Sequence, residues 1–229
     1  DLSPWDVSNV INMSSMFRDT DVFNGDISSW DVSSVTNMGW MFIGAISFNQ
    51  NISTWDVSSV MTMNLMFDGA YNFNGDLSSW DVSSVTNMVG MFSSATSFNG
   101  DISTWDVSSV TNMGSMFDAS NFNQDISNWD VSSVTNMQYM FRDADNFNGD
   151  ISGWDVSSVT DMSWLFRNAE SFNQDLSSWD VSSVTDMYNM FRNAGFFNMK
   201  CVVFILRTLP APDQSRPPDR RYLLFPPTF

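Results

Sequence analysis

The chain has 229 residues, of which 43% are hydrophobic, and this composition excludes a disordered polymer. Its formal net charge of −17 makes nucleic acid and anionic membranes poor partners, and the lack of histidine removes the commonest general base. The single cysteine, Cys201, excludes a disulfide framework.

A unit of 25 residues repeats from the start of the chain to Asn198. A tryptophan marks each unit, and the period is kept throughout except for one interval of 24 residues. The marker positions are Trp5, Trp30, Trp55, Trp80, Trp105, Trp129, Trp154 and Trp179. A fixed period of this length predicts a solenoid, in which each unit buries its apolar face by stacking on its neighbours.

The first half of a unit predicts a turn followed by a very short strand. In the unit 73–97, the dipeptide Asn74-Gly75 is a strong turn signal. The following segment 76–78, Asp-Leu-Ser, suits a parallel strand paired with the same triplet in the neighbouring units.

The second half of the unit predicts a short helix. Its apolar residues have offsets of 0, 3, 6, 7 and 10, which place them on one helical face. These residues are Val85, Met88, Met91, Phe92 and Ala95. One or two turns of helix are expected at 85–95.

Together these elements predict an α/β repeat solenoid, a right-handed coil similar to a leucine-rich repeat, with very short parallel strands and short helical turns. The alternative is an all-β solenoid without helices. Residues 1–198 are expected to form eight repeats, and residues 199–229 a partly disordered tail. The tail holds five of the nine basic residues and six of the seven prolines, and it is interpreted as a C-terminal cap or as non-native read-through sequence.

The repeat carries the motif W-D-V-S-S-V-T-N-M-x-x-M-F, preceded by F-N-x-D-I-S. It resembles the repeat of BspA-type surface proteins, found in mycoplasma lipoproteins, other bacteria and marine microbial eukaryotes. The resemblance covers residues 1–198. It implies a leucine-rich-repeat-like solenoid on cell surfaces, associated with adhesion or recognition, and it supplies no catalytic residues.

Polar residues also recur in columns, meaning equivalent positions of successive units. Stacked asparagine amides are expected to hydrogen-bond along the solenoid, and each tryptophan indole N–H needs a nearby acceptor. The asparagine column is Asn24, Asn49, Asn74, Asn99, Asn123, Asn148, Asn173 and Asn198.

Two aspartate columns have two interpretations. Their carboxylates are expected to cap turns by accepting hydrogen bonds from backbone N–H groups. The other interpretation is binding of Ca²⁺, which takes several oxygen ligands, although the glycine-rich nonapeptide of calcium-binding β-rolls is absent. The candidate Ca²⁺ ligands are Asp76, Asp81, Asp101 and Asp106; no other metal or cofactor is expected.

The variable positions that face outward are the candidate ligand-binding residues. Exposed aromatic side chains along one ridge can stack on sugars or anchor a protein partner. The candidates are Trp40, Leu65, Tyr71, Tyr139, Trp164 and Tyr188. The alternative is drift at unconstrained surface positions. Asn12 and Asn51 match the N-glycosylation sequon.

The sequence therefore predicts a non-enzymatic recognition or adhesion module with an acidic surface, located outside the cell or on its surface. An enzyme is not expected, because nearly every polar group recurs from unit to unit whereas an active site is singular. The expected partner is a protein or glycan at a cell surface, without nucleic acid or direct membrane insertion. The alternative is a structural protein that associates head to tail into filaments or an extracellular matrix.

Overall fold

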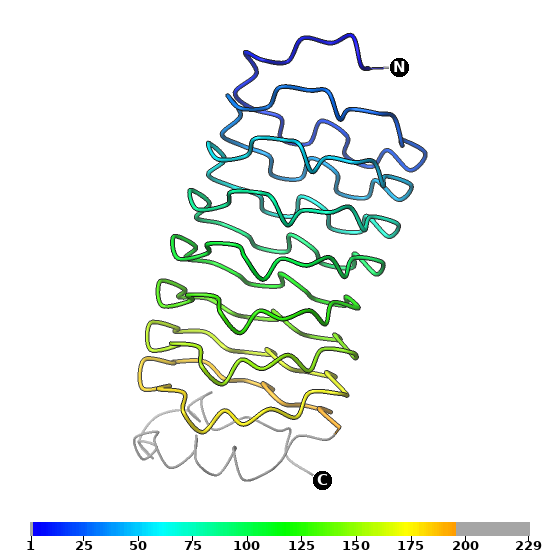
Figure 1. Ribbon diagram of the computed structural model, residues 1–229. Coiled ribbons are helices and arrows are strands. Elements are labelled where there is room, and N and C mark those ends of the chain that lie inside the picture. Colours follow the sequence, from blue (N-terminus) through cyan, green and yellow to red (C-terminus); the bar gives the residue numbers. More distant parts are fainter. Residues whose placement is uncertain (1, 196–229) are drawn as a thin grey trace.

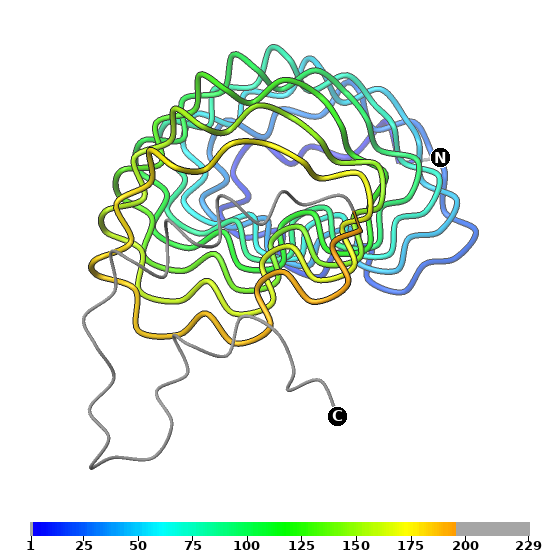
Figure 2. The same ribbon diagram turned by 90° about the horizontal axis from the view of Figure 1, so that it is seen from below.

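The computed structural model describes residues 2–195, which wind into coils that stack one beneath the next in chain order (Figure 1). Seen along the stack, the successive coils follow a similar outline (Figure 2). Asn198, Cys201 and the predicted tail 199–229 lie outside the described residues.

Within residues 2–195 the backbone forms neither a helix nor a strand. Its β-type pairing consists of one isolated parallel bridge between each coil and the next. The bridged residues are Asn12, Asn37, Thr62, Asn87, Asn112, Asn136, Asp161 and Asp186. Every coil therefore keeps the same register with its neighbours.

The segment 85–95, where the sequence predicted a short helix, contains two β-turns with a positive φ, and a third bond, from Ser93 N to Gly90 O (3.1 Å), joins them. Met91 N donates to Met88 O (3.2 Å) and Ala95 N donates to Phe92 O (3.1 Å). The third residue of each turn has a positive φ, 60° at Gly90 and 55° at Ser94. A bond between residues three apart, with a positive φ at the third position, is typical of a type II turn. The helix prediction was therefore wrong for this segment.

Hydrogen bonding between coils explains why these turns replace a helix. Met88 N donates to Asn112 O (3.1 Å) and Gly90 N donates to Gly114 O (2.8 Å) in the next coil, whereas a helix would use these N–H groups internally. The rings of Phe92 and Phe117, in adjacent coils, lie 5.9 Å apart. Packed helices need about 8–10 Å between their axes. The coils are therefore too close together for a helical layer.

The segment 76–78, where a strand was predicted, forms no strand and leads into a turn at 77–80. Ser78 N donates to the side chain of Asp76 (2.9 Å), and Trp80 N donates to Leu77 O (3.1 Å). The parallel bridge of this coil lies instead at Asn87, which follows Asp81 and Val85 in the sequence. The described part of the chain therefore contains neither the short helix nor the short strand that the sequence predicted.

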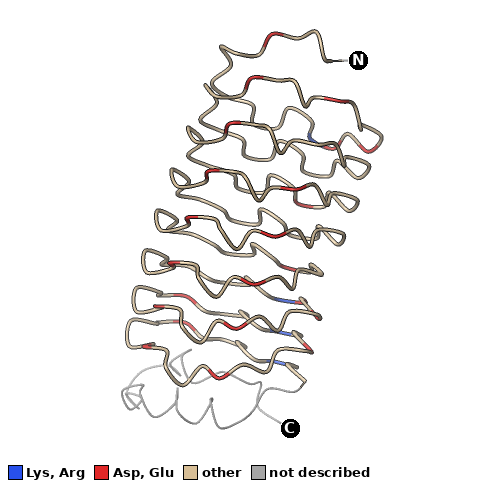
Figure 3. Ribbon diagram, viewed as in Figure 1, with Lys and Arg blue, Asp and Glu red and all other residues tan. Residues whose placement is uncertain are grey.

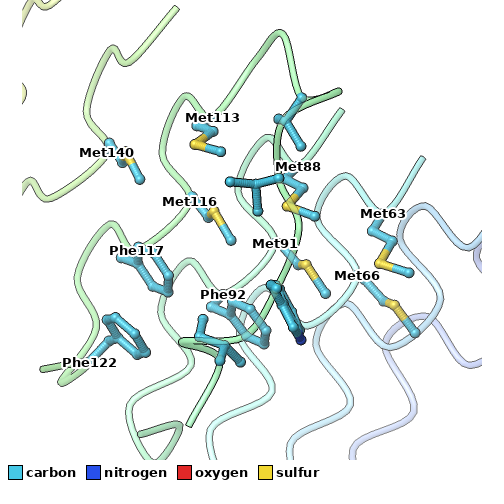
Figure 4. Close-up of a cluster of buried hydrophobic side chains, with 14 of the residues drawn as sticks. Met63, Met66, Met88, Met91, Phe92, Met113, Met116, Phe117, Phe122 and Met140 are labelled. Atoms are coloured by element: carbon cyan, nitrogen blue, oxygen red, sulfur yellow. The ribbon is translucent and has the colours of Figure 1, made fainter. Parts of the chain in front are cut away.

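The core consists of columns of equivalent apolar side chains running the length of the stack. Figure 4 shows methionines and phenylalanines of neighbouring coils side by side, among them Met88, Met113 and Met116. Within one coil, the rings of Phe92 and Phe98 stack 3.9 Å apart. The residues assigned to the core from the repeat pattern are fully or almost fully buried in the middle coils.

Two of the predicted polar ladders are confirmed. Asn99 N donates to Asn74 Oδ1 (3.0 Å), and Asn99 Oδ1 accepts from Asn123 N (2.9 Å). The indole N–H of Trp105 donates to Leu77 O of the preceding coil (3.0 Å). Each coil is therefore tied to its neighbours by backbone, amide and indole hydrogen bonds.

The coil that is one residue shorter keeps its place in the stack. Four residues lie between Phe117 and Phe122, whereas five lie between Phe92 and Phe98 in the preceding coil. The Phe117 and Phe122 rings still stack at 4.1 Å, and the indole of Trp129 still reaches Ile102 O (3.1 Å). The bend between the two phenylalanines is one residue shorter, and these contacts of the coil are kept.

Candidate functional site

The aspartate columns cap turns. Asp81 Oδ1 accepts hydrogen bonds from Ser83 Oγ (2.6 Å) and Ser83 N (3.1 Å), and these bonds lower the pKa of Asp81. Asp101 accepts a hydrogen bond from Ser103 N (2.9 Å). This backbone bond is the main cause that lowers the pKa of Asp101, and a bond from the Ser103 side chain is the second. These bonds stabilise the charged carboxylates along the stack.

The Ca²⁺ candidates Asp76, Asp81, Asp101 and Asp106 do not gather into a cation site. Within residues 2–195, no group of three or more acidic or cysteine side chains is placed to hold a metal ion. Their Oδ1 atoms bind the serine two residues ahead instead. The structure thus supports turn capping for these four residues.

The two sequon asparagines are exposed and have the same capping role. Asn12 Oδ1 accepts from Ser14 N (2.9 Å). Asn51 Oδ1 accepts from Ser53 N (3.0 Å) and Ser53 Oγ (2.7 Å). Local turn geometry accounts for both residues.

Four of the six ligand candidates belong to one column that adopts an unusual backbone conformation. Every member of this column has a φ between 55° and 62°. The members are Ser15, Trp40, Leu65, Gly90, Ser115, Tyr139, Trp164 and Asn189. Glycine takes this conformation freely, whereas other L-residues lose about 1–2 kcal/mol. Bulky residues are therefore held here at an energetic cost.

The structure brings three of the candidates together. The rings of Tyr139 and Trp164 stack 6.0 Å apart, and Trp164 meets Tyr188 edge to face at 5.2 Å. All three are partly exposed. We call Tyr139, Trp164 and Tyr188 the aromatic ridge.

The other three candidates lie in earlier coils. Trp40 and Tyr71 are 37% and 46% exposed, and among the described residues neither makes a ring contact with the aromatic ridge. Leu65 covers Gly90, where an added Cβ would lie 2.4 Å from Leu65 Cδ2. Leu65 therefore has a packing role between coils.

Two arginines that the sequence analysis did not single out cover the aromatic ridge. The guanidinium carbon of Arg142 lies 4.6 Å from the Tyr139 ring centroid, and that of Arg167 lies 4.9 Å from Trp164. Arg142 N donates to Tyr139 O (3.0 Å), and Arg167 N donates to Trp164 O (3.1 Å). The turn thus places each arginine over its aromatic residue. In the sequence, each of these arginines follows its aromatic residue by three positions, and this shared spacing could have identified the pairs.

The two arginines differ in their acidic partners. Arg142 Nε donates to Asp118 Oδ1 (2.8 Å) and lies 3.4 Å from Asp143 Oδ2. Burial raises the pKa of Asp118, although the hydrogen bond from Arg142 opposes that rise. Arg167 has no ion pair with any residue of the described range, and its buried Nε has no hydrogen-bond partner there.

The charges are unevenly distributed along the stack. Figure 3 shows acidic segments in every coil, whereas basic segments lie one beneath another only in the last described coils. These basic residues are Arg142, Arg167 and Arg192, at equivalent positions. The aromatic ridge therefore lies beside a basic column, whereas the other described coils carry Arg18 as their single basic residue.

No helix in residues 2–195 is long and apolar enough to cross a membrane. None of the curated proteins compared with the chain matches it significantly. A family model described as "Mycoplasma protein of unknown function, DUF285" matches three overlapping segments, residues 1–103, 51–129 and 90–204. Together these segments span residues 1–204 of 229 and include all of the described coils, so the chain belongs to the DUF285 family.

Proposed function

We propose that this chain is a non-enzymatic recognition or adhesion module of the BspA-like type, located outside the cell or on its surface. In this proposal the coil stack is a solenoid that serves as a scaffold, and a protein or glycan binds to its variable positions. The observation that carries the proposal is the aromatic ridge, Tyr139, Trp164 and Tyr188, in continuous ring contact across three coils.

The residue types at two positions of this ridge support a role in binding. Tyr139 and Trp164 have φ values of 60° and 62°, at a position where Gly90 and Asn189 show that small or polar residues also fit. The turn imposes this φ on every described coil, so an aromatic residue at this position is kept at a cost that glycine would avoid. Partly exposed aromatic residues at such positions suit a surface that binds a partner.

A binding array of glycans and surface proteins tests the proposal. We expect the full chain to bind at least one class, and a triple alanine variant of Tyr139, Trp164 and Tyr188 to lose that binding. A double alanine variant of Trp40 and Tyr71, which lie outside the aromatic ridge, serves as the control and should bind normally. Equal binding by the triple variant and the unchanged protein would contradict the proposal.

The alternative of a structural protein that assembles end to end has one observation in its favour. Each described coil binds the next through equivalent donors and acceptors, as in Met88 N to Asn112 O and Met113 N to Asn136 O, so coils of different copies are chemically compatible. Light scattering over a range of concentrations separates the two roles. A constant monomer mass favours recognition, and growth in mass with concentration favours assembly.

A further inference from the structure

The marker tryptophans place one indole ring in every described coil, and the rings follow one another along the stack. The rings of Trp105, Trp129 and Trp154 are parallel to within 3°, and neighbouring centroids lie 6.5 Å apart. In the first coils, the rings of Trp5 and Trp30 lie 6.4 Å apart. These distances are typical of offset-stacked aromatic rings. We call the eight marker tryptophans the indole column.

One hydrogen bond recurs at every step of the indole column from Trp30 onward. Each indole N–H donates to a backbone carbonyl of the preceding coil at 3.0–3.1 Å, as from Trp80 to Ile52 O. This bond holds the rings in equivalent positions, so they follow one another at the coil spacing of about 4.8 Å. Because electron transfer weakens steeply with distance, rings this close can exchange an electron.

The buried part of the indole column keeps a positive vacancy mobile. Indole is among the side chains that lose a single electron most readily, and the radical cation becomes fixed when its N–H proton leaves. From Trp30 to Trp179 the column is only 2–4% exposed, so water does not take this proton. The peptide carbonyl that accepts the N–H bond is too weak a base to remove it. A vacancy formed here therefore passes to the next ring.

The acidic surface stabilises positive charge in the indole column. An aspartate follows every marker tryptophan directly, as in Trp80-Asp81 and Trp105-Asp106. Hydrogen bonds from the serine two residues ahead, first from its hydroxyl and then from its backbone, lower the pKa of Asp81 and Asp106. Both are therefore charged at neutral pH, and their attraction lowers the free energy of a radical cation nearby.

Trp5 differs from the rest of the indole column because its side chain reaches water. It is 54% exposed, whereas Trp30, on which its ring stacks, is 4% exposed. A positive charge has a lower free energy in water than in an apolar interior. Water can also accept the N–H proton of a Trp5 radical cation, which traps the vacancy at this residue.

Two surface tryptophans outside the indole column are poorer places for the vacancy. The guanidinium carbon of Arg167 lies 4.9 Å from the Trp164 ring, and its positive charge opposes removal of an electron there. Trp40 is 37% exposed. Among the described residues, neither Trp40 nor Trp164 makes a ring contact with the indole column. Oxidation through the column is thus distinguishable from oxidation across the surface.

We propose that the indole column conducts one-electron oxidation along the stack and delivers it to Trp5. A one-electron oxidant at the surface, such as a peroxide-derived radical, takes an electron from the nearest indole. The neighbouring indole refills that vacancy, which thereby moves one coil at a time. At Trp5 the radical cation releases its proton to water, and a thiol returns one hydrogen atom to restore the indole. This activity goes beyond the proposed recognition function and does not depend on it.

The methionine-rich core is protected by such a path. Met91 and Trp105 belong to one buried cluster, and the ring of Phe92, beside Met91 in Figure 4, lies 6.3 Å from the Trp105 ring. A sulfoxide formed in this core would place a polar group among apolar side chains and disrupt their packing. Thioethers lose an electron less readily than indoles do, so the column takes the oxidation first.

The first experiment places a photo-oxidant far from Trp5. A ruthenium polypyridyl complex is attached to the full chain with Ser183→Cys and Cys201→Ser, in the coil of Trp179. Seven coil intervals, about 34 Å, separate that coil from Trp5. After flash-quench oxidation, peptide mass spectrometry locates the oxygen-addition products. We expect more product at Trp5 than at Trp40 or Trp164, although both lie in coils nearer to the complex.

The second experiment interrupts the indole column. Trp80→Phe combined with Trp105→Phe leaves three coil intervals, about 14 Å, without an indole, and the Trp5 product should be lost. Phe73→Leu combined with Phe98→Leu is the matched control, since it alters two buried rings of the same coils and keeps every indole. The Trp5 product should remain in this control. Unfolding midpoints confirm that both variants fold.

A third variant tests the exit without altering the buried core. In Trp5→Phe the vacancy has no indole in water to reach, so product should accumulate at Trp30 instead. A mixture with an isotope-labelled chain that lacks ruthenium separates transfer within one molecule from transfer between molecules. Trp5 product confined to the ruthenium-bearing chain supports the proposal. Product confined to Trp154 and Trp179, undiminished Trp5 product after interruption of the column, or a preference for Trp164 would overturn it.

Discussion

At the scale of single residues, positive φ angles recur at two fixed positions in every described coil. The second of these columns has φ values from 52° to 67°. Its members are Asp19, Gly44, Gly69, Ser94, Ala119, Asp143, Asn168 and Asn193. These residues stay in this conformation because the coils require it: Ala119 N donates to Arg142 O (2.7 Å) in the next coil, and Gly69 N donates to Ser93 O (2.9 Å).

Ala119→Gly should stabilise the protein. Alanine at a φ of 52° loses about 1–2 kcal/mol, whereas glycine in the unfolded chain costs about 0.5–1 kcal/mol in entropy, which leaves a net gain of about 0.5 kcal/mol. Urea unfolding of the variant measures this gain.

Ala144→Gly is the matched control for this change. Ala144 is fully buried and is not among the residues with positive φ, so its loss should destabilise by about 1–2 kcal/mol from backbone entropy and the buried methyl group. A destabilised Ala119→Gly variant would show that backbone strain at Ala119 is negligible.

At the scale of structural elements, hydrogen-bonded columns set the spacing of the coils. Asn99 is representative, because its backbone N–H binds the preceding coil and its side-chain oxygen binds the following one. The same link recurs along the column from Asn24 to Asn173. Each link spans one interface, so its loss should weaken two coils without disturbing the rest.

Asn99→Ala should destabilise the protein by about 1 kcal/mol, because Asn123 N loses its acceptor. Asn72→Ala is the control, since the exposed Asn72 side chain hydrogen-bonds no residue of the described range and its backbone bond to Ile46 O is kept. Thermal unfolding compares the two. Equal shifts in both variants would show that the asparagine column adds little to stability.

The sequence could predict the period, the core columns and the asparagine ladder, because each is a simple consequence of stacking equal units. It could not distinguish a helix from turns at 85–95. In both structures the inward-facing apolar residues follow one another at intervals of about three residues. Glycine marks the turn at Gly90, but Trp40 and Tyr139 occupy the same position and hide that signature.

The candidate site was predictable only in part for a similar reason. The variable column identified Tyr139 and Trp164 as outward-facing residues. The arginines were counted only toward net charge, and their position over these rings follows from turns that the sequence analysis did not predict. Arg167 became recognisable once the structure showed which carboxylates pair with Arg142.

At the scale of the whole molecule, the acidic surface is stabilised by local hydrogen bonds. In the described residues, eleven aspartates of the two aspartate columns have lowered pKa values, and a bond from the serine two residues ahead is the largest cause in every case. Repulsion between neighbouring carboxylates, as between Asp101 and Asp125, acts in the opposite direction and is a smaller effect. Asp68 and Asp118 have raised pKa values, with burial as the main cause.

Stability should therefore fall in acid. A carboxyl whose folded-state pKa is lowered stabilises the fold above its unfolded pKa of about 3.9, and this contribution is lost as the pH falls through the lower folded value. Asp68 and Asp118 affect stability in the opposite direction, since protonation relieves the cost of burying their charge. These two carboxyls are outnumbered by the eleven whose pKa is lowered. Urea unfolding at neutral pH and below pH 4 measures the difference, and a rise in stability on acidification would show that repulsion among the carboxylates dominates.

The shorter coil shows where the length of this chain is free to vary in evolution or by design. Between Phe117 and Phe122 one residue is missing, yet Asn123 N still reaches Asn99 Oδ1 (2.9 Å). A residue inserted after Ser120 should therefore be accommodated with little loss of stability, because neighbouring coils already have that length. An insertion after Gly114, inside a turn bonded to the coils on both sides, should prevent folding of that coil. The bends that follow the second turn of each coil are thus the natural places to graft loops onto this scaffold without disturbing the stack.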